Sequence, residues 1–240
     1  GGGSNLLISD AGFAGTVIRV ESKGNALDYD ACSGGMIEVS AGEDWDKFVE
    51  QTIEKGFADL ESLSGIPGTV GGAPIQNIGA YGHEVSETIA RVKAYDRKKG
   101  EVITFTNEQC HFSYRNSAFK EDAGRYVILN VTFQLRKGEM SLPITYAELA
   151  NYLSVSLGDR APVMKVRKAV LELRGRKGML INSTDVNSNS AGSFFVNPIL
   201  TKDVADKLPT DAPRWPQSDG RVKTSAAWLM EHAGVSKGEK

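Results

Sequence analysis

Residues 64–82 read SGIPGTVGGAPIQNIGAYG, and this segment holds six glycines, two prolines and no charged side chain. Glycine loosens the backbone and proline removes an amide donor, so the segment favours neither helix nor strand. A stretch with so few side chains to offer is expected to present its backbone to something that lies directly against it. The segment therefore predicts a binding loop.

The glycines are spaced G-x-x-G-x-x-G-G at residues 65–72, which matches neither the dinucleotide fingerprint nor a P-loop. No Walker lysine follows, so the sequence argues against ATP hydrolysis by that route. Glycines at this spacing still let several backbone N–H groups surround an anion. Gln76 and Asn77 add side-chain donors and acceptors that suit a flat heterocycle. The pattern favours a phosphate-bearing cofactor, and a long surface loop is the alternative that stays open.

A second glycine-rich turn, GGGSN, occupies residues 1–5 and leads into the apolar residues LLIS. Two glycine-rich turns, each beside a strand, suit the two phosphates of a pyrophosphate group. GGGS is also a common expression linker, and a linker would have to be left out of the fold. Both interpretations of residues 1–5 are open at this point.

The composition limits the class of protein. The 240 residues carry 28 basic and 30 acidic side chains, a net charge of −2, and 40% of them are hydrophobic. This near-neutral balance argues against a nucleic-acid partner, which requires a basic face. No apolar run reaches the roughly 18–20 residues of a membrane span and no signal peptide is visible, so we expect a cytoplasmic protein without membrane insertion. Cys32 and Cys110 have no CxxC or histidine-rich partner, so no metal site is expected.

Hydrophobic periodicity predicts a mixed α+β protein. Strands are expected at residues 5–8, 16–20, 36–39, 89–95, 102–105 and 126–135. Helices are expected at residues 45–55, 146–153, 163–173, 203–207 and 224–233. The basic stretch KVRKAVLELRGRK at residues 165–177 is predicted to form the solvated face of a helix. The polar residues 181–190 predict a connection to a second unit, so we expect domains at 1–180 and 181–240.

Five motifs carry a specific resemblance: GGGSNLLISD, SGIPGTVGGAPIQNIGAYG, YRNSAFK, LPITYAEL and SAGSFFVNPIL. Together, and in this order from residue 1 to about residue 238, they resemble the UDP-N-acetylenolpyruvoylglucosamine reductase family, in the variant that carries a tyrosine loop. The resemblance implies an α+β FAD-binding fold of the vanillyl-alcohol oxidase and p-cresol methylhydroxylase type in residues 1–180. It further implies a separate α+β substrate-binding domain in residues 181–240.

The same resemblance implies a non-covalently bound FAD and NADPH as co-substrate. In the family's reaction NADPH passes a hydride to FAD, and the reduced flavin adds a hydride to the vinyl carbon of UDP-N-acetylglucosamine enolpyruvate. The product is UDP-N-acetylmuramate, a precursor of peptidoglycan. By analogy with the loops that wrap FAD in this family, the expected cofactor contacts are Gly2, Gly3, Ser4, Asn5, Gly65, Ile66, Gly71, Gly72, Gln76, Asn77, Gly79 and Ala80.

Two residues match catalytic positions of the family. Arg115, in YRNSAFK, matches the arginine beside the substrate carboxylate, which would be held bidentately while negative charge develops on it. Ser193, in AGSFFVNP, matches the proton donor to the enolate-like intermediate, and a serine hydroxyl serves here because the enolate is strongly basic. From the residues alone, Arg115 would be a surface side chain and Ser193 a turn or helix cap.

Four further residues match substrate-contact positions, with Tyr146 on the loop that closes over the diphosphate. The expected substrate contacts are Tyr114, Tyr146, Lys177 and Asn197. The chain departs from the family pattern at both ends. The first FAD subdomain is expected to be incomplete before Gly1, and the chain stops at Lys240 before the family's C-terminal carboxylate strand. Neither Glu231 nor Glu239 has the context of that carboxylate, so we assign the role to neither.

Two alternatives remain at this stage. One is a flavin-dependent sugar or lactone oxidase of the same fold, whose FAD is often tethered to a histidine such as His83. The other is a truncated nucleotide-binding module without catalysis. The reductase interpretation also implies a monomer whose substrate is a UDP-sugar enolpyruvyl ether.

Overall fold

The computed structural model describes residues 6, 8–30, 34–182, 184, 185, 188, 195–217 and 219–236. The chain divides into two compact units, Gly1–Ser190 and Ala191–Lys240. The division thus follows Ser190, whereas the sequence placed it after residue 180.

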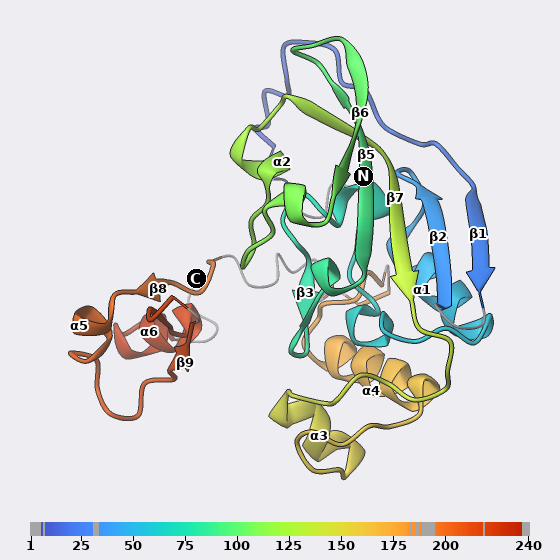
Figure 1. The fold of residues 1–240 in the computed structure, drawn as a ribbon. Coiled ribbons are helices and arrows are strands. Elements are labelled where there is room, and N and C mark those ends of the chain that lie inside the picture. The colour runs from blue at the N-terminus through green and yellow to red at the C-terminus, as the bar shows by residue number, and fades with distance from the viewer. Residues whose placement is uncertain are drawn as a thin grey trace. The chain divides into compact units, whose positions relative to one another are not determined.

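The first unit is built around a five-stranded antiparallel sheet in the order β1-β2-β7-β5-β6 (Figure 1). Its strands are β1 (Asn25–Asp30), β2 (Gly34–Ser40), β5 (Ile89–Asp96), β6 (Glu101–Thr106) and β7 (Tyr126–Leu135). The central strand β7 pairs on both sides through Val131, which lies opposite Val39 in β2 and Val92 in β5. All three valines are 0% exposed, so the core of the unit is centred on this strand.

Helix α1 (Trp45–Glu54) covers one face of the sheet. Its buried residues Trp45, Phe48, Val49, Thr52 and Ile53 recur at the three- and four-residue spacing of one helical face. The ring of Phe48 packs 5.0 Å from that of Phe133 in β7. The helix begins at Asp44, whose side chain accepts a hydrogen bond from the N–H of Lys47 at 3.0 Å.

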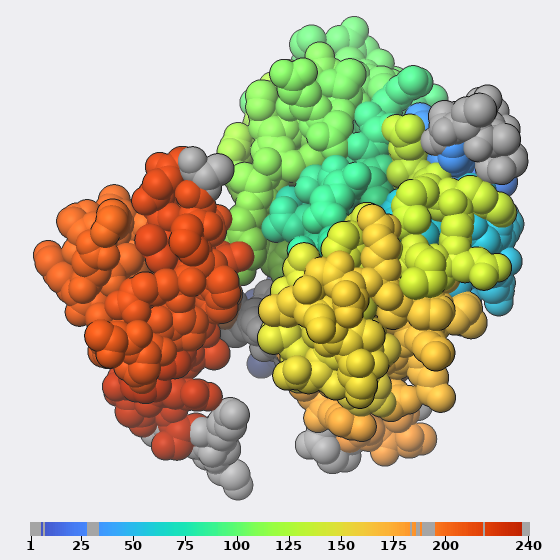
Figure 2. Space-filling model, turned by 60° about the horizontal axis from the view of Figure 1, so that its bottom comes forward, coloured from blue at the N-terminus to red at the C-terminus, as the bar shows by residue number. Residues whose placement is uncertain are grey.

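Short elements lie between α1 and β5 and between β6 and β7. They are η1 (Glu61–Leu63), η2 (Val70–Gly72), β3 (Gly79–Ala80), β4 (His83–Glu84), η3 (Val85–Glu87), η4 (Glu108–Cys110) and α2 (Ala118–Glu121). Helices α3 (Ala147–Leu153) and α4 (Val163–Arg176) then pack on each other around a second buried cluster that includes Leu149, Val166 and Val170. In Figure 2 these two helices form the continuous yellow surface of the first unit.

The second unit contains a small antiparallel sheet in the order β8-β10-β9. Its elements are β8 (Ile199–Leu200), α5 (Lys202–Ala205), β9 (Trp215–Pro216), β10 (Val222–Lys223) and α6 (Ala226–His232). Ser225 caps α6, because its hydroxyl accepts from the N–H of Trp228 at 3.2 Å.

The strands predicted near the N-terminus are not formed in the described residues. Residues 16–20 form no strand, and Val17 and Ile18 are 76% and 83% exposed. The residues that the structure describes between 5 and 8, Leu6 and Ile8, are likewise outside any strand. β-Branched residues favour a strand only when a neighbouring strand pairs with them, and here the edge position is taken by β1, which the sequence did not predict.

The other predicted elements of the first unit are present with ends shifted by a few residues. Strand β7 covers the predicted residues 126–135, and β5 and β6 form the predicted hairpin. None of the helices in the described part of the chain has the length and hydrophobicity needed to cross a membrane.

Candidate functional site

The glycine-rich segment, residues 64–82, begins beside the N-terminal end of α1. The N–H of Trp45 donates to the carbonyl of Gly68 at 3.1 Å, and the N–H of Val70 donates to the carbonyl of Glu43 at 2.9 Å. An isolated bridge between Asp44 and Thr69 continues this pairing. The segment is therefore held along the residues that lead into a buried helix, and its position is fixed by the core.

The glycines of the segment differ in the space around them. A Cβ atom at Gly71 would lie 2.5 Å from the Cβ of Ala41, so the backbone of the segment packs closely there against the residue that follows β2. No heavy atom lies within 4 Å of a Cβ built at Gly68, and the nearest to a Cβ at Gly72 is 3.9 Å away. Gly68 and Gly72 thus leave bare backbone facing open space, as close approach of a ligand requires.

Several amides of the segment donate within the chain. Among the glycines, the N–H of Gly65 donates to Asp46 Oδ1 at 2.6 Å, that of Gly71 to the Ala41 carbonyl at 2.9 Å and that of Gly72 to the Thr69 carbonyl at 2.9 Å. These three bonds shape the segment. An anion bound at the segment would therefore accept hydrogen bonds from N–H groups other than those of these three glycines.

Asn77 holds the second half of the segment together. It is fully buried, and its φ of +46° is in the left-handed region that asparagine tolerates. Its Nδ2 donates to Glu84 Oε2 at 2.6 Å and to the carbonyl of Ser113 at 3.1 Å, while its Oδ1 accepts from the N–H of Ser86 at 3.1 Å. The side chain of Asn77, predicted to contact a cofactor, is thus engaged in bonds inside the protein.

Arg115 lies directly on the glycine-rich segment. Its Nη1 donates to the carbonyl of Asn77 at 3.2 Å, and its Nη2 donates to the carbonyl of Gly79 at 2.6 Å. Its own carbonyl accepts from Lys120 Nζ at 2.8 Å. A Cβ at Gly79 would lie 2.8 Å from the carbonyl oxygen of His83 and 3.1 Å from Nη1 of Arg115, so the close pairing of β3 with β4 beside this guanidinium favours glycine.

The backbone of Arg115 is strained, and its side chain carries a charge without a close counterion. Its φ is +55°, a conformation that costs free energy for a residue with a long side chain and is often found at functional sites. Among the described residues no carboxylate lies within ion-pair distance of the guanidinium, which contacts carbonyl oxygens instead. Such an arginine can receive an anionic group.

Tyr146 and Lys177 lie at the end of the α3–α4 pair. The half-exposed ring of Tyr146 packs edge-on against Tyr81 of the glycine-rich segment, with ring centroids 5.4 Å apart. Burial raises the pKa of Tyr81 to about 12. Lys177 Nζ lies 2.5 Å from Glu148 Oε2. In Figure 2 the yellow helices border the teal surface of the chain around β3 and β4.

Arg167 and Arg174 are functional candidates that the sequence did not single out. The basic stretch at residues 165–177 was predicted to be solvated, but Arg167 is only 7% exposed and pairs with Asp46 at 2.6 Å. Arg174 Nε donates to the carbonyl of Gly65 at 3.2 Å, and burial lowers the pKa of Arg174. The prediction is wrong for these two residues because the helix buries the face that carries them. Charge alternating with valine and leucine does not distinguish the two faces.

The ring of Tyr114 lies beside Arg115, whose guanidinium carbon is 5.5 Å from the ring centroid. The other remaining predicted residues divide into three groups. Gly2, Gly3, Ser4, Asn5 and Ser193 lie outside the described residues. Ile66 and Ala80 are half-buried and pack against the core, and Gln76 is half-buried. Asn197 belongs to the second unit, where its Oδ1 accepts from the N–H of Ala226 at 3.0 Å at the start of α6.

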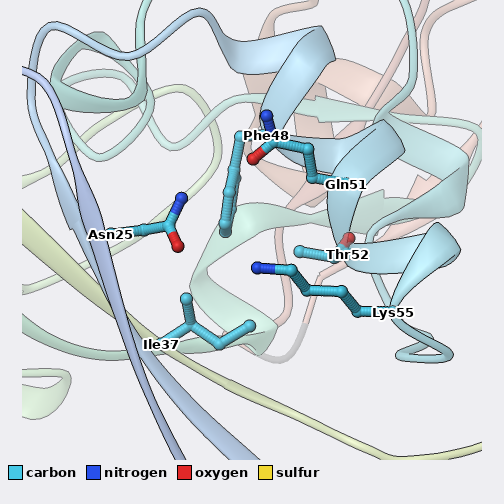
Figure 3. Close-up of a pocket in the computed structure, with 6 residues that line it drawn as sticks. All are labelled: Asn25, Ile37, Phe48, Gln51, Thr52 and Lys55. Carbon is cyan, nitrogen blue, oxygen red and sulfur yellow. The ribbon is translucent and has the colours of Figure 1, made fainter.

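A pocket elsewhere in the first unit does not involve the predicted site residues. Figure 3 shows its lining, in which side chains of α1 and the residue after it face Asn25 and Ile37 of strands β1 and β2. The lining residues are Asn25, Ile37, Phe48, Gln51, Thr52 and Lys55. Within the described part of the chain, no group of three or more histidine, cysteine or acidic side chains could hold a metal ion.

Comparisons with known proteins bear on the same regions. Residues 1–106 match the family described as FAD binding domain. UDP-N-acetylenolpyruvoylglucosamine reductase of Cutibacterium acnes is 52% identical over 240 residues, which cover 100% of this chain and 63% of that protein. The proteins of the same name from Streptomyces avermitilis and Thermobifida fusca are 50% and 48% identical, over 99% of this chain and 67% and 69% of theirs.

A solved structure shares the fold. The crystal structure of UDP-N-acetylenolpyruvylglucosamine reductase from Thermus caldophilus superposes with a TM-score of 0.58 and 24% identity, covering 98% of this chain and 65% of that chain. This likeness supports the predicted FAD-binding architecture. The chain spans about two thirds of the length of the curated relatives that it matches.

Proposed function

Since the chain belongs to the UDP-N-acetylenolpyruvoylglucosamine reductase family, we propose that it is part of an FAD-dependent enzyme that reduces UDP-N-acetylglucosamine enolpyruvate to UDP-N-acetylmuramate with NADPH. The observation that carries this proposal is the attachment of Arg115 to the uncharged glycine-rich segment, through the carbonyls of Asn77 and Gly79. Arg115 could bind a carboxylate, and the glycine-rich segment could bind a nucleotide cofactor. The hydrogen bonds between them place these two functions next to each other.

The segment fits FAD in its chemistry. It carries no charge, and Gly68 and Gly72 leave open space where a side chain would otherwise stand. We propose that the cofactor is held there without a covalent bond, by the glycine-rich segment and by Gly2, Gly3, Ser4 and Asn5. When bound, FAD would accept a hydride from NADPH and supply it to the vinyl carbon of the substrate.

We propose that Arg115 holds the substrate carboxylate. Its guanidinium is fixed by two carbonyl contacts and has no carboxylate partner within ion-pair distance among the described residues. As negative charge moves into the substrate carboxylate, a fixed cation beside it stabilises the transition state more than the ground state. One such donor is commonly worth about 3–4 kcal/mol of activation free energy.

We propose that Ser193 donates the proton that completes the reaction, on the carbon next to the one that receives the hydride. The substrate would be held through Tyr114, Tyr146, Lys177 and Asn197. In support, Tyr146 and Lys177 lie at the end of one helix pair, and Tyr146 contacts Tyr81 of the segment. We propose that residues 1–180 form the FAD-binding domain, which also supplies Arg115, Tyr114, Tyr146 and Lys177 to the substrate. Residues 181–240 would form the substrate-binding domain, in a cytoplasmic monomer.

The histidine-tethered oxidase finds less support than the reductase. Both ring nitrogens of His83 are engaged, Nδ1 with Glu87 Oε2 at 2.8 Å and Nε2 with the carbonyl of Pro143 at 3.2 Å. A covalent bond to flavin would have to break one of these contacts.

The experiment is an anaerobic two-step reaction of the natural protein that contains this chain. NADPH should bleach the bound flavin, and UDP-N-acetylglucosamine enolpyruvate should restore its colour in the absence of oxygen. A flavin that is reoxidised rapidly by oxygen but not by this substrate would overturn the proposal in favour of an oxidase.

A further inference from the structure

We propose that Asp46 is a positioning residue for the glycine-rich segment: held by Arg167, its carboxylate fixes the first glycine, Gly65, and so sets the segment for FAD. This inference rests on the proposed function. It concerns Asp46 of α1 and Arg167 of α4, to which the proposed reaction assigns no role, and their link to Gly65 of the segment.

The geometry joins the three elements at one carboxylate. Asp46 Oδ1 accepts from the N–H of Gly65 at 2.6 Å and from Arg167 Nη1 at 2.6 Å, while Oδ2 accepts from Nη2 at 3.0 Å. This is a bidentate pair between a planar guanidinium and a carboxylate, the arrangement with the greatest directional specificity. The side chain of Arg167 is only 9% exposed. Its buried positive charge is therefore stabilised by pairing with the carboxylate of Asp46.

Both backbone polar groups of Gly65 are hydrogen-bonded to side chains. While its N–H donates to Asp46, its carbonyl accepts from Arg174 Nε at 3.2 Å. Its φ is +70°, and a Cβ there would lie 2.6 Å from Cδ2 of Leu180. The backbone direction in which the chain leaves Gly65 is therefore determined by these partners. The open backbone at Gly68 follows three residues later.

Asp46 is not required to start α1. That task belongs to Asp44, whose side chain accepts from the N–H of Lys47 at 3.0 Å. Asp46 instead bonds away from the helix, to the segment and to Arg167. Burial would raise the pKa of Asp46, but hydrogen bonds from Arg167 and Gly65 outweigh it and lower that pKa, so the carboxylate stays ionised.

The test compares Asp46→Asn with two controls in the natural protein, prepared free of flavin. FAD affinity is measured by quenching of flavin fluorescence, and stability by urea unfolding without FAD. Asp46→Asn keeps the shape but removes the charge that holds Arg167, so the Kd for FAD should rise about tenfold, as expected for loss of a charged hydrogen bond. The absorption spectrum of the remaining bound flavin should shift as well.

Glu50→Gln is the first control, because Glu50 contacts Arg167 at 3.3 Å but not the segment, and its Kd should match the unchanged protein. Arg125→Gln is the second, because it removes the pair with Asp96 in the sheet and lowers stability without touching the segment. Equal FAD affinity in Asp46→Asn and in these controls would refute the positioning role.

If Asp46→Asn does not fold, Arg167→Lys decides the matter, since it keeps the charge and loses the bidentate geometry. Weaker FAD binding in that variant supports the proposal, and unchanged binding refutes it. If the unchanged protein binds no FAD at all, the proposed function fails. If it binds FAD and the variants bind it equally well, only the positioning role fails.

Discussion

Gly71 and Gly72 are adjacent glycines, and their replacement by alanine should affect different properties. Gly71→Ala should lower stability, whereas Gly72→Ala should weaken FAD binding. In Gly71→Ala the new methyl group would lie 2.5 Å from the Cβ of Ala41 and 3.0 Å from its carbonyl oxygen. Ala41 cannot retreat easily, because its N–H donates to the carbonyl of Leu129 in β7 at 2.8 Å. Overpacking of this kind costs roughly 1–3 kcal/mol, so Gly71→Ala should lower the free energy of unfolding by about that amount.

Gly72→Ala has no such conflict. The nearest heavy atom to its new Cβ would be 3.9 Å away, and Gly72 is not among the glycines with positive φ. Stability should therefore change by no more than about 0.5 kcal/mol, or rise slightly because alanine restricts the unfolded chain. If FAD lies against this bare backbone, the methyl group must displace it, and we expect the Kd for FAD to rise at least about tenfold, or 1.4 kcal/mol.

The assay measures both quantities for both variants. Urea unfolding of the flavin-free protein, followed by circular dichroism, gives stability, and titration with FAD gives affinity. Gly72→Ala with the stability of the unchanged protein and a weakened affinity supports the account. Gly72→Ala that binds FAD normally would refute the reasoning that this backbone is a contact surface, and Gly71→Ala of unchanged stability would refute the packing argument.

Three further predictions concern other residues. Arg115→Lys keeps a positive charge but loses the fork, so reoxidation of the reduced flavin by the enolpyruvyl substrate should slow by about 10²–10³-fold, and an unchanged rate in stopped-flow absorbance would contradict the role. Ser193→Ala should leave reduction of the flavin by NADPH intact while turnover of the substrate stalls; normal steady-state turnover would remove Ser193 from the mechanism. The pair with Arg125 lowers the pKa of Asp96 from 3.8 to about 2, so the pair's contribution to stability should be complete above pH 4 and disappear as the pH falls towards 2. Acid unfolding of the unchanged protein and of Asp96→Asn checks this, and a stability difference that is as large at pH 2 as at pH 5 would argue against it.

The parts of the fold that could be predicted from the sequence are those whose signal is local. Strand β7 covers the predicted residues because apolar and β-branched residues fill it, and α1 follows from the spacing of Trp45, Phe48, Val49 and Ile53. The segment 16–20 has the composition of a strand, but it pairs with no strand in the described part of the chain. Pairing depends on residues distant in sequence, which a local pattern does not contain.

The site shows the same limit. The glycine-rich segment could be predicted from its composition, and Arg115 could be predicted from the family resemblance. The contact between them joins residues 38 positions apart, and that between Asp46 and Arg167 joins residues 121 positions apart. The residues next to Arg115 do not predict its backbone strain, and the residues next to Arg167 do not predict its burial. Both follow from tertiary packing.

The central claim is that the backbone of residues 64–82 receives FAD. Hydrogen–deuterium exchange of the natural protein, with and without FAD, tests it most directly. We predict slower amide exchange in peptides that cover residues 64–82 and no change in peptides that cover the pocket residues in and just after α1, Phe48 to Lys55. Flavin binding that leaves exchange in residues 64–82 unaltered and protects another part of the chain would contradict the account.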